Sequence, residues 1–145
     1  MFRQLSGSAR EVAILVARVL VGVVLFAHGF EKVFANGFGY TSSHFAQMGV
    51  PLAPLSAAYA STVEVVGGSL LILGAATTVV AALAVLDMIG ATLTTGHYAA
   101  IFVQNRGFEL EGALCAGLLL LLVLGAGRFS LDHLLLSRRR ATVTT

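Results

Sequence analysis

Four ionisable side chains lie inside long apolar stretches of this 145-residue chain: Arg18, His28, Glu64 and Asp87. An unpaired charge near the centre of a lipid bilayer costs at least about 2.5 to 3.5 kcal/mol. A chain that keeps several such groups must pair them, hydrate them in a cavity or use them in chemistry. The space between the helices is therefore the first place to look for function.

The composition places the chain in a lipid bilayer. Hydrophobic residues make up 57% of it, charged residues only 11%, and its mean hydropathy is +0.90. A soluble domain carries about twice that share of charged residues. At about 20 residues for each spanning helix, we expect an all-α fold with a transmembrane four-helix bundle in one domain, residues 1–145. The predicted spans cover residues 9–34, 55–74, 79–98 and 109–124.

A short segment follows the fourth span and bears on orientation. Gly125-Ala126-Gly127 ends that span, and Ser130 can cap an amphipathic helix over residues 130–137 that would lie in the membrane interface. Basic residues are concentrated near the two chain ends, whereas the opposite side carries only Lys32 and Arg106. Because cytoplasmic loops are enriched in Lys and Arg, both termini are predicted to be cytoplasmic.

Several classes of function are disfavoured. The net charge of +2 is too small, and its arginines too concentrated at the ends, to suggest nucleic acid as a partner. Cys115 is the single cysteine, which excludes an internal disulfide or a dithiol redox pair. No P-loop, nucleotide fingerprint, Ser-His-Asp arrangement, haem ligand set or iron–sulfur motif is visible.

The polar residues of the spans fall into two predicted layers once odd spans are taken to run outward and even spans inward. The central layer consists of Arg18, Glu64 and Asp87. The outer layer consists of His28, Lys32, His97, Glu109 and Glu111.

The central layer has two open interpretations. In one, Arg18 and Glu64 form a structural clamp between helices, because the guanidinium fork matches a carboxylate. In the other, these residues take part directly in function. The layer holds one positive and two negative groups, so Asp87 is the first candidate for a group that exchanges a proton. Glu111 is a second candidate, in the outer layer.

The outer layer suits a wet vestibule for a small polar ligand or a quinone head group better than a metal site. His28 and His97 are far apart in sequence, and Glu109 and Glu111 point to different sides of a helix, so no spacing is diagnostic of a metal. Gly67 and Gly68 follow Glu64 by three and four residues. Such small residues let a neighbouring helix approach closely, which is a packing role.

Several segments, in their order and spacing, resemble the DoxX family of small four-helix membrane proteins. The matching segments are Ala17-Arg18, His28-Gly29-Phe30-Glu31-Lys32, Glu64-Val65-Val66-Gly67-Gly68, His97, Gly107-Phe108-Glu109 and the closing Gly125-Ala126-Gly127-Arg128-Phe129-Ser130-Leu131-Asp132. The resemblance implies a multi-pass protein of a prokaryotic plasma membrane with an association with redox chemistry, since relatives resemble membrane subunits of thiosulfate:quinone oxidoreductases. Asp87 and Glu111 lie outside the family pattern.

We therefore expect the membrane subunit of a redox-associated complex that binds a quinone, or a small sulfur or oxygen species, inside the bundle. Arg18 and Glu64 would shape the site, and His28, Lys32, His97 and Glu109 would exchange protons or hold an anionic substrate. Electrons would come from a soluble or membrane redox enzyme or from the substrate itself, and the chain could form a homo-oligomer. Two alternatives are a membrane scaffold or assembly protein whose buried charges are only structural, and a small transporter.

Overall fold

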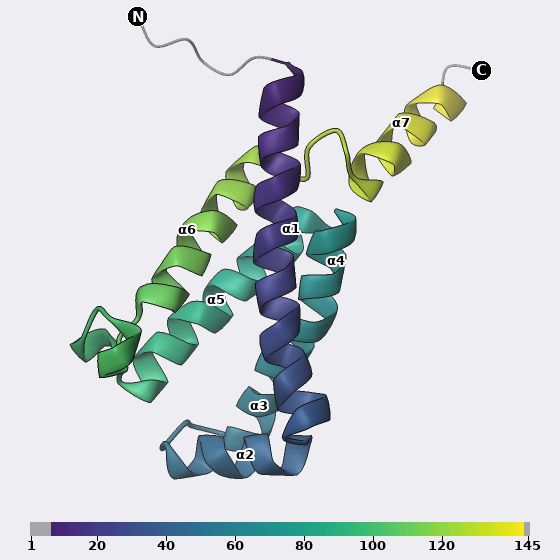
Figure 1. Ribbon diagram of the computed structural model, residues 1–145. Coiled ribbons are helices and arrows are strands. Elements are labelled where there is room, and N and C mark those ends of the chain that lie inside the picture. The colour runs from purple at the N-terminus through teal and green to yellow at the C-terminus, as the bar shows by residue number, and fades with distance from the viewer. Residues whose placement is uncertain (1–6, 144–145) are drawn as a thin grey trace, which may run out of the picture.

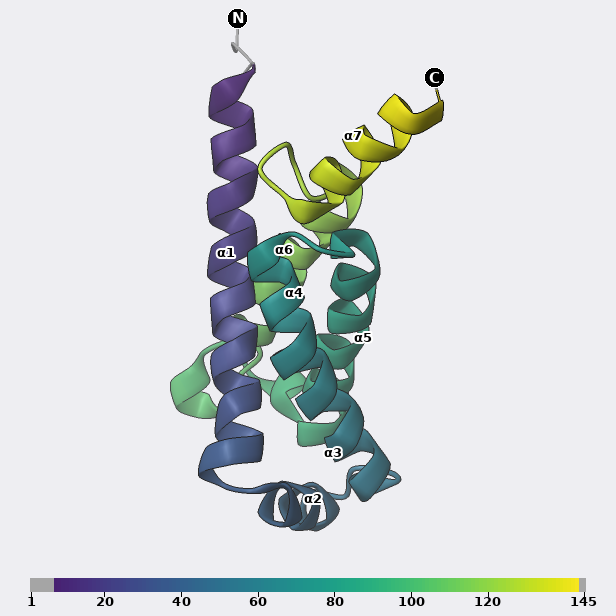
Figure 2. The ribbon, with the colours of Figure 1, turned by 90° about the vertical axis from the view of Figure 1, so that its right-hand side faces the viewer.

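The computed structural model describes residues 7–143, with side chains as far as Ser137, and contains no strand in that range (Figures 1 and 2). Helix α1, Ser8–Phe30, continues directly into a π-helical turn, η1, Glu31–Ala35. The remaining elements in chain order are α2 (Phe38–Gln47), α3 (Ala53–Thr62), the π-helical turn η2 (Val63–Gly67), α4 (Gly68–Leu73), α5 (Thr77–Thr95), the short 3-10 helices η3 (His97–Ala99) and η4 (Val103–Asn105), α6 (Glu109–Leu124) and α7 (Leu131–Val143).

Three helical segments of the described chain are long and apolar enough to cross a membrane: Ser8–Ala35, Ala53–Leu73 and Thr77–Thr95. They correspond to the first three predicted spans, and the all-helical prediction is confirmed. Helix α6 has 16 residues, which amounts to about 24 Å. It is as apolar as the other three and packs along α5.

The helices are arranged so that the first and last described helices, α1 and α7, reach the same end of the molecule (Figures 1 and 2). α1 runs the full length and packs against η2 and α4, while α5 packs against α6. The start of α1 and the end of α7 lie at the same end, and α2 lies across the opposite end (Figures 1 and 2). We refer to these as the terminal end and the α2 end.

Glycines allow α1 and α4 to pack with their backbones in contact. A Cβ atom on Gly22 would lie 2.9 Å from the carbonyl oxygen of Gly68, and one on Gly68 would lie 2.7 Å from the backbone nitrogen of Phe26. No larger residue fits there without a shift of backbone. In a membrane such close van der Waals contact replaces the hydrophobic effect as the force between helices, so Gly68 has the packing role predicted for it.

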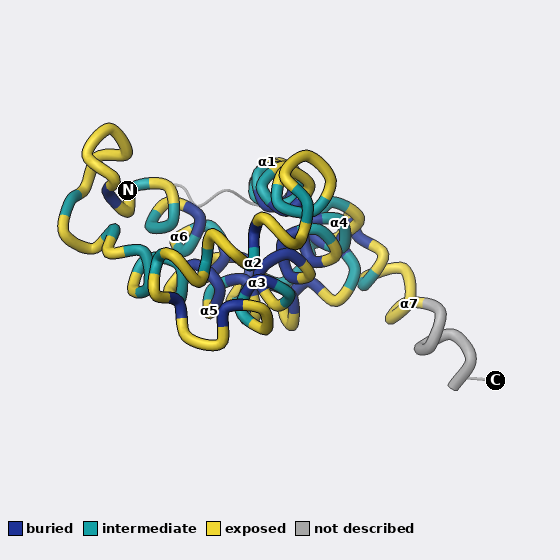
Figure 3. Tube along the Cα trace, turned by 90° about the horizontal axis from the view of Figure 1, so that it is seen from below, coloured by how far each residue is buried: buried dark blue, intermediate teal, exposed yellow. Residues whose placement is uncertain are grey.

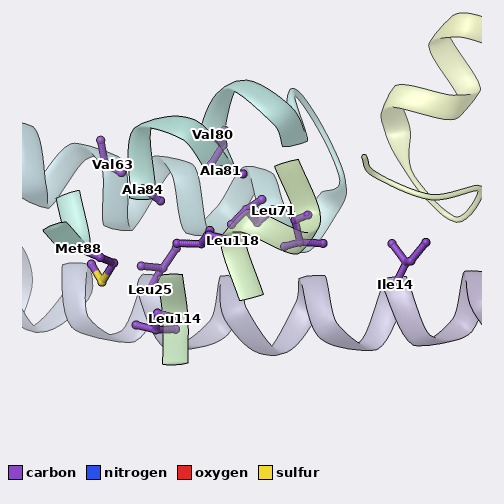
Figure 4. Close-up of a cluster of buried hydrophobic side chains, with 11 residues drawn as sticks. Ile14, Leu25, Val63, Leu71, Val80, Ala81, Ala84, Met88, Leu114 and Leu118 are labelled. Carbon is purple, nitrogen blue, oxygen red and sulfur yellow. The ribbon is translucent and has the colours of Figure 1, made fainter. Parts of the chain in front are cut away.

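Apolar side chains fill the space between the helices. Leu25 of α1, Leu71 of α4 and Leu118 of α6 are fully buried and belong to one cluster (Figure 4). Seen along the molecule, buried positions face inward and many outward positions are exposed (Figure 3). The exposed ones include Val79, Leu83 and Leu86 on α5, which suits a surface in contact with lipid.

Three segments differ from the sequence expectation. The stretch after the first span contains α2, Phe38–Gln47, where a polar loop was expected. The C-terminal helix covers Leu131–Val143 and not residues 130–137. The third span ends at Thr95, earlier than predicted, because Gly96 takes a left-handed conformation with φ +74°, which terminates a helix.

Candidate functional site

A buried ion pair joins α1 to the helix that follows α3. The ammonium of Lys32 lies 2.5 Å from both carboxylate oxygens of Glu64, and the side chains are 26% and 5% exposed. The predicted clamp between Arg18 and Glu64 is therefore wrong, because Glu64 is paired with Lys32. A fully engaged carboxylate at this depth fixes how the two helices face each other.

Both partners of the pair stand in π-helical turns, Lys32 in η1 and Glu64 in η2. Single π-helical turns within α-helices frequently mark functional sites. Gly29 makes the approach possible, since a Cβ atom there would lie 2.7 Å from the Cβ of Glu64 and from the nitrogen of Val65. The regular α-helical geometry is thus interrupted in both segments that form the contact.

A cavity of about 480 Å³ opens beside this pair, between α2, α3 and α5; we call it the main cavity. Its lining includes three exposed leucines, Leu52, Leu55 and Leu86. Its polar end is formed by Lys32, Glu64 and Asp87; other lining residues include Phe45, Met48, Tyr59, Gly90, Ala91, Thr94 and Thr95. The volume and the mostly apolar lining with a few convergent polar groups are typical of small-molecule sites.

Asp87 lines the main cavity and is only 6% exposed. Its Oδ2 atom has no hydrogen-bond partner within the described part of the protein. Buried polar atoms are nearly always hydrogen-bonded to protein or water, so an orphan of this kind needs an explanation. A ligand group or a water molecule in the cavity would supply the missing bond.

A smaller cavity of about 110 Å³, which we call the chamber, lies on the other side of the ion pair. His28 and Glu111 line it, and Lys32 and Glu64 line both it and the main cavity. At its outer edge the Nδ1 atom of His97 lies 2.7 Å from Oε1 of Glu111. The ion pair of Lys32 and Glu64 therefore separates two cavities that both contain ionisable groups.

Arg18 belongs to a different part of the molecule. It is 1% exposed and donates from Nη2 to the carbonyl oxygen of Phe129, 2.7 Å away. Its guanidinium packs against Gly74, where a Cβ atom would lie 1.6 Å from Nη1. The predicted central layer of Arg18, Glu64 and Asp87 therefore does not form: Arg18 lies toward the terminal end, and the two carboxylates lie at the main cavity.

The segment around Phe129 ties the terminal end together, a role that sequence reasoning missed for Asp132. The carboxylate of Asp132 accepts hydrogen bonds from the backbone nitrogens of Ala76 and Thr77, at 2.7 and 3.0 Å, and so caps α5. Ser130 accepts a bond from the nitrogen of His133, 3.1 Å away, which confirms its predicted capping role. The Gly-x-Gly-Arg-x-Ser-Leu-Asp segment was the available signal.

A cavity of about 610 Å³ also lies at the terminal end, beside this segment. Both carboxylates in its wall are already bound to backbone nitrogens, Asp132 as above and Glu11 at 2.7 Å from the nitrogen of Arg128. The wall groups thus hold the fold together. The main cavity, with an unpartnered carboxylate oxygen, is the better candidate site although it is smaller.

Of the other predicted site residues, Glu109 is the one that lies apart. It begins α6, is half-buried, and lines neither the main cavity nor the chamber. His28 is partly exposed and lines the chamber, and His97 is partly exposed and contacts Glu111, which lines the chamber. Among residues 7–143, no three His, Cys, Asp or Glu side chains gather in a way that could hold a metal ion.

Comparison with known proteins gives a consistent result. The sequence model of the family described as DoxX matches residues 13–97. The chain is 31% identical to "Inner membrane protein YphA" of Escherichia coli (strain K12), over 88% of this chain and 93% of that protein. It is 33% identical to "Uncharacterized membrane protein Rv3486" of Mycobacterium tuberculosis (strain ATCC 25618 / H37Rv), over 89% and 85%. No solved structure matches the chain.

A third relative carries a functional name. The chain is 33% identical to "Putative oxidoreductase CatD" of Bacillus subtilis (strain 168), over 68% of this chain and 70% of that protein. Together with the three apolar spans, the relatives confirm the prediction of a multi-pass protein of a prokaryotic plasma membrane.

Proposed function

The chain belongs to the DoxX family, and from that premise we propose that it is a redox-associated membrane protein that binds a quinone head group in the main cavity. The observation that carries the proposal is the lining of this cavity. The lining is mostly apolar and includes the exposed leucines Leu52, Leu55 and Leu86, together with the ionisable groups of Lys32, Glu64 and Asp87. A ligand with an apolar tail and a polar head, dissolved in the bilayer, matches that combination.

The polar groups suit both forms of a quinone. Lys32 can donate a hydrogen bond to a carbonyl oxygen of the ring. Asp87 has a free acceptor in Oδ2, which suits a hydroxyl group of the quinol. The bond to Asp87 is favourable because Oδ2 is otherwise buried without a partner among the described residues, and the bond from Lys32 adds to its ion pair with Glu64.

Quinone reduction takes up two electrons and two protons and gives the quinol. We propose that the electrons come from a soluble or membrane redox enzyme docked on this chain, and that Asp87 and Glu64 pass protons to the ring oxygens. The oxidoreductase name of the Bacillus relative supports the redox association. A small sulfur or oxygen species is the second candidate ligand, favoured by the ionisable side chains of His28, Lys32, Glu64 and Glu111 in the lining of the chamber.

The proposal includes an orientation. α1, the segment α3 to α4, α5 and α6 would together form a transmembrane four-helix bundle, with both termini in the cytoplasm and the α2 end on the outer side. The packing of α6 along α5 and against α1 supports four spans. The excess of arginine near the chain ends supports the orientation. A homo-oligomer would leave the mouth of the main cavity open to lipid.

Lys32 is the only lysine of the chain, and this provides a direct binding test. Protein labelled with ¹⁵N-lysine in lipid nanodiscs is titrated with a short-tailed ubiquinone and a short-tailed menaquinone. We expect the Nζ signal of Lys32 to shift with one of them. The affinity, measured by calorimetry, should fall about ten- to hundredfold in Asp87→Asn, the effect of losing one hydrogen bond to a charged group.

The matched control is Glu109→Gln, a carboxylate outside both cavities, which should bind as the natural protein does. A Lys32 signal that neither quinone shifts, in protein that is folded, would refute quinone binding at this cavity. Sustained ion or solute flux through liposomes containing the protein would favour a transporter. If a variant in which Lys32 and Glu64 are changed together keeps both ligand binding and partner recruitment, a scaffold would be favoured.

A further inference from the structure

Four ionisable side chains line the chamber, and they come from different helical segments. His28 and Lys32 reach it from α1 and η1, Glu64 from η2 and Glu111 from α6, whereas α5 contributes the apolar wall with Met88 and Ala91. A cavity holds water when it is large enough and offers two to four polar partners. At about 30 Å³ for each molecule, this chamber of about 110 Å³ has room for three waters.

The ionisable groups around the chamber form a series of decreasing exposure. The side chain of His97 is 29% exposed, that of Glu111 is 15% and that of Glu64 is 5%. His97 and Glu111 are in direct contact at 2.7 Å, and Glu111 and Glu64 line the same chamber. The series begins at the α2 end and leads to the inner end of the main cavity.

We propose that a chain of water molecules in the chamber connects the His97–Glu111 pair to the Lys32–Glu64 pair and carries protons from the aqueous phase to the ligand in the main cavity. The step is a proton transfer only: a proton leaves water at His97, passes through Glu111 and the waters, and reaches Glu64. Glu64 in turn faces the main cavity together with Asp87.

This assignment gives Glu111 and His97 distinct roles from Glu109. Glu111 contacts both His97 and the chamber, so its carboxylate can accept a proton on one side and release it on the other. Glu109 is two residues earlier on the same helix and lines neither cavity. The proposal depends on the proposed function only for the identity of the final proton acceptor.

The presence of the waters is tested without any ligand. In ¹⁵N-lysine protein in lipid, solid-state NMR measures the transfer of magnetisation from water to the Nζ atom of Lys32. Leu114→Phe fills the chamber, and Leu55→Phe makes the same change in the main cavity alone. We expect fast transfer in the natural protein and in Leu55→Phe, and loss of that transfer in Leu114→Phe.

The proton path is tested on the same signal. The exchange of the ammonium protons of Lys32 with water should slow by about a hundredfold in Glu111→Gln and in His97→Gln, the lower end of the range for losing an acid-base group. Glu109→Gln should leave the rate unchanged. The two Glu→Gln substitutions keep side-chain size. An unchanged far-ultraviolet circular dichroism spectrum verifies that each variant is folded.

Transfer that stays fast in Leu114→Phe would overturn the water chain. Equal exchange rates in Glu111→Gln, His97→Gln and the natural protein would overturn the proton path. Both results are independent of quinone binding, so failure of the quinone titration with slowed exchange in Glu111→Gln would refute the ligand and leave the path.

Discussion

The ion pair between Lys32 and Glu64 is the contact whose removal is most informative. The perturbation is a double-mutant cycle: Lys32→Met, Glu64→Met, and the double variant Lys32→Met with Glu64→Met. Each side chain is replaced by one of similar length, so changes in packing are small. The cycle separates the strength of the pair from the effect of each change alone.

The two single variants should have unequal costs because the partners are unequally buried. Lys32→Met leaves the carboxylate of Glu64, 5% exposed, without a partner in an apolar surrounding, which costs about 3 kcal/mol. Glu64→Met leaves the ammonium of Lys32, which is 26% exposed and has a flexible stem that can reach water. Its loss should be nearer 1 kcal/mol.

The double variant should unfold with nearly the same free energy as the natural protein, within about 1 kcal/mol, because methionines fill the space of the pair with no charge left buried. Thermal unfolding in lipid nanodiscs, followed by circular dichroism, measures all four proteins. The coupling between the two changes should be at least about 2 kcal/mol. A double variant as unstable as the sum of its two single variants would show that the pair carries no such coupling, and the contact would lose its role in fixing the helices.

Three further predictions concern backbone contacts and can be tested in the same unfolding assay. Gly74→Ala should destabilise the protein by more than about 2 kcal/mol, since Gly74 has φ +73° and a Cβ atom there would overlap the guanidinium of Arg18; Arg18→Met in that background should restore part of the loss. Asp132→Ala removes the cap of α5 and should cost about 1 to 2 kcal/mol, with faster hydrogen exchange at the first amides of that helix as its signature. Gly29→Val should prevent the approach of η2 and abolish the Lys32 ammonium signal typical of the ion pair, whereas Gly39→Ala, at a position with open space, should change neither property.

The spans were predictable because hydropathy and helix length report directly on the bilayer. The pairing of the charges was not. Glu64 lies in a π-helical turn, and such a turn inserts about one extra residue, so the side chains beyond it point about 100° away from where an unbroken α-helix would place them. Lys32 lies in a second turn of this kind. A depth argument based on regular helices therefore paired Glu64 with Arg18 in place of Lys32.

The contacts of the terminal end could not be predicted from the sequence for another reason. Asp132 caps a helix that begins 55 residues earlier in the chain, and no local pattern identifies the distant end of such a bond. Ser130 caps its own helix from the adjacent position, and its role could be predicted from the residue type. Local hydrogen bonds were thus accessible from the sequence, and bonds between distant segments were not.

The two ends of the molecule satisfy their buried charges by different means, and this difference is informative. Toward the terminal end, Arg18 and Asp132 bind backbone atoms of neighbouring segments, so these charges serve to close the fold. At the main cavity, Glu64 is bound to a side chain, and Asp87 keeps an acceptor without a partner. Arg18 also keeps two donors, Nε and Nη1, without a partner among the described residues, so an unsatisfied atom alone does not distinguish the two ends. Asp87 differs because its open acceptor lines a cavity with room for a ligand, and a bond from that ligand would remove a cost of about 1 to 3 kcal/mol. Changes at Arg18 and Asp132 should therefore lower stability and leave ligand binding unchanged in protein that is folded, whereas changes at Asp87 should weaken ligand binding.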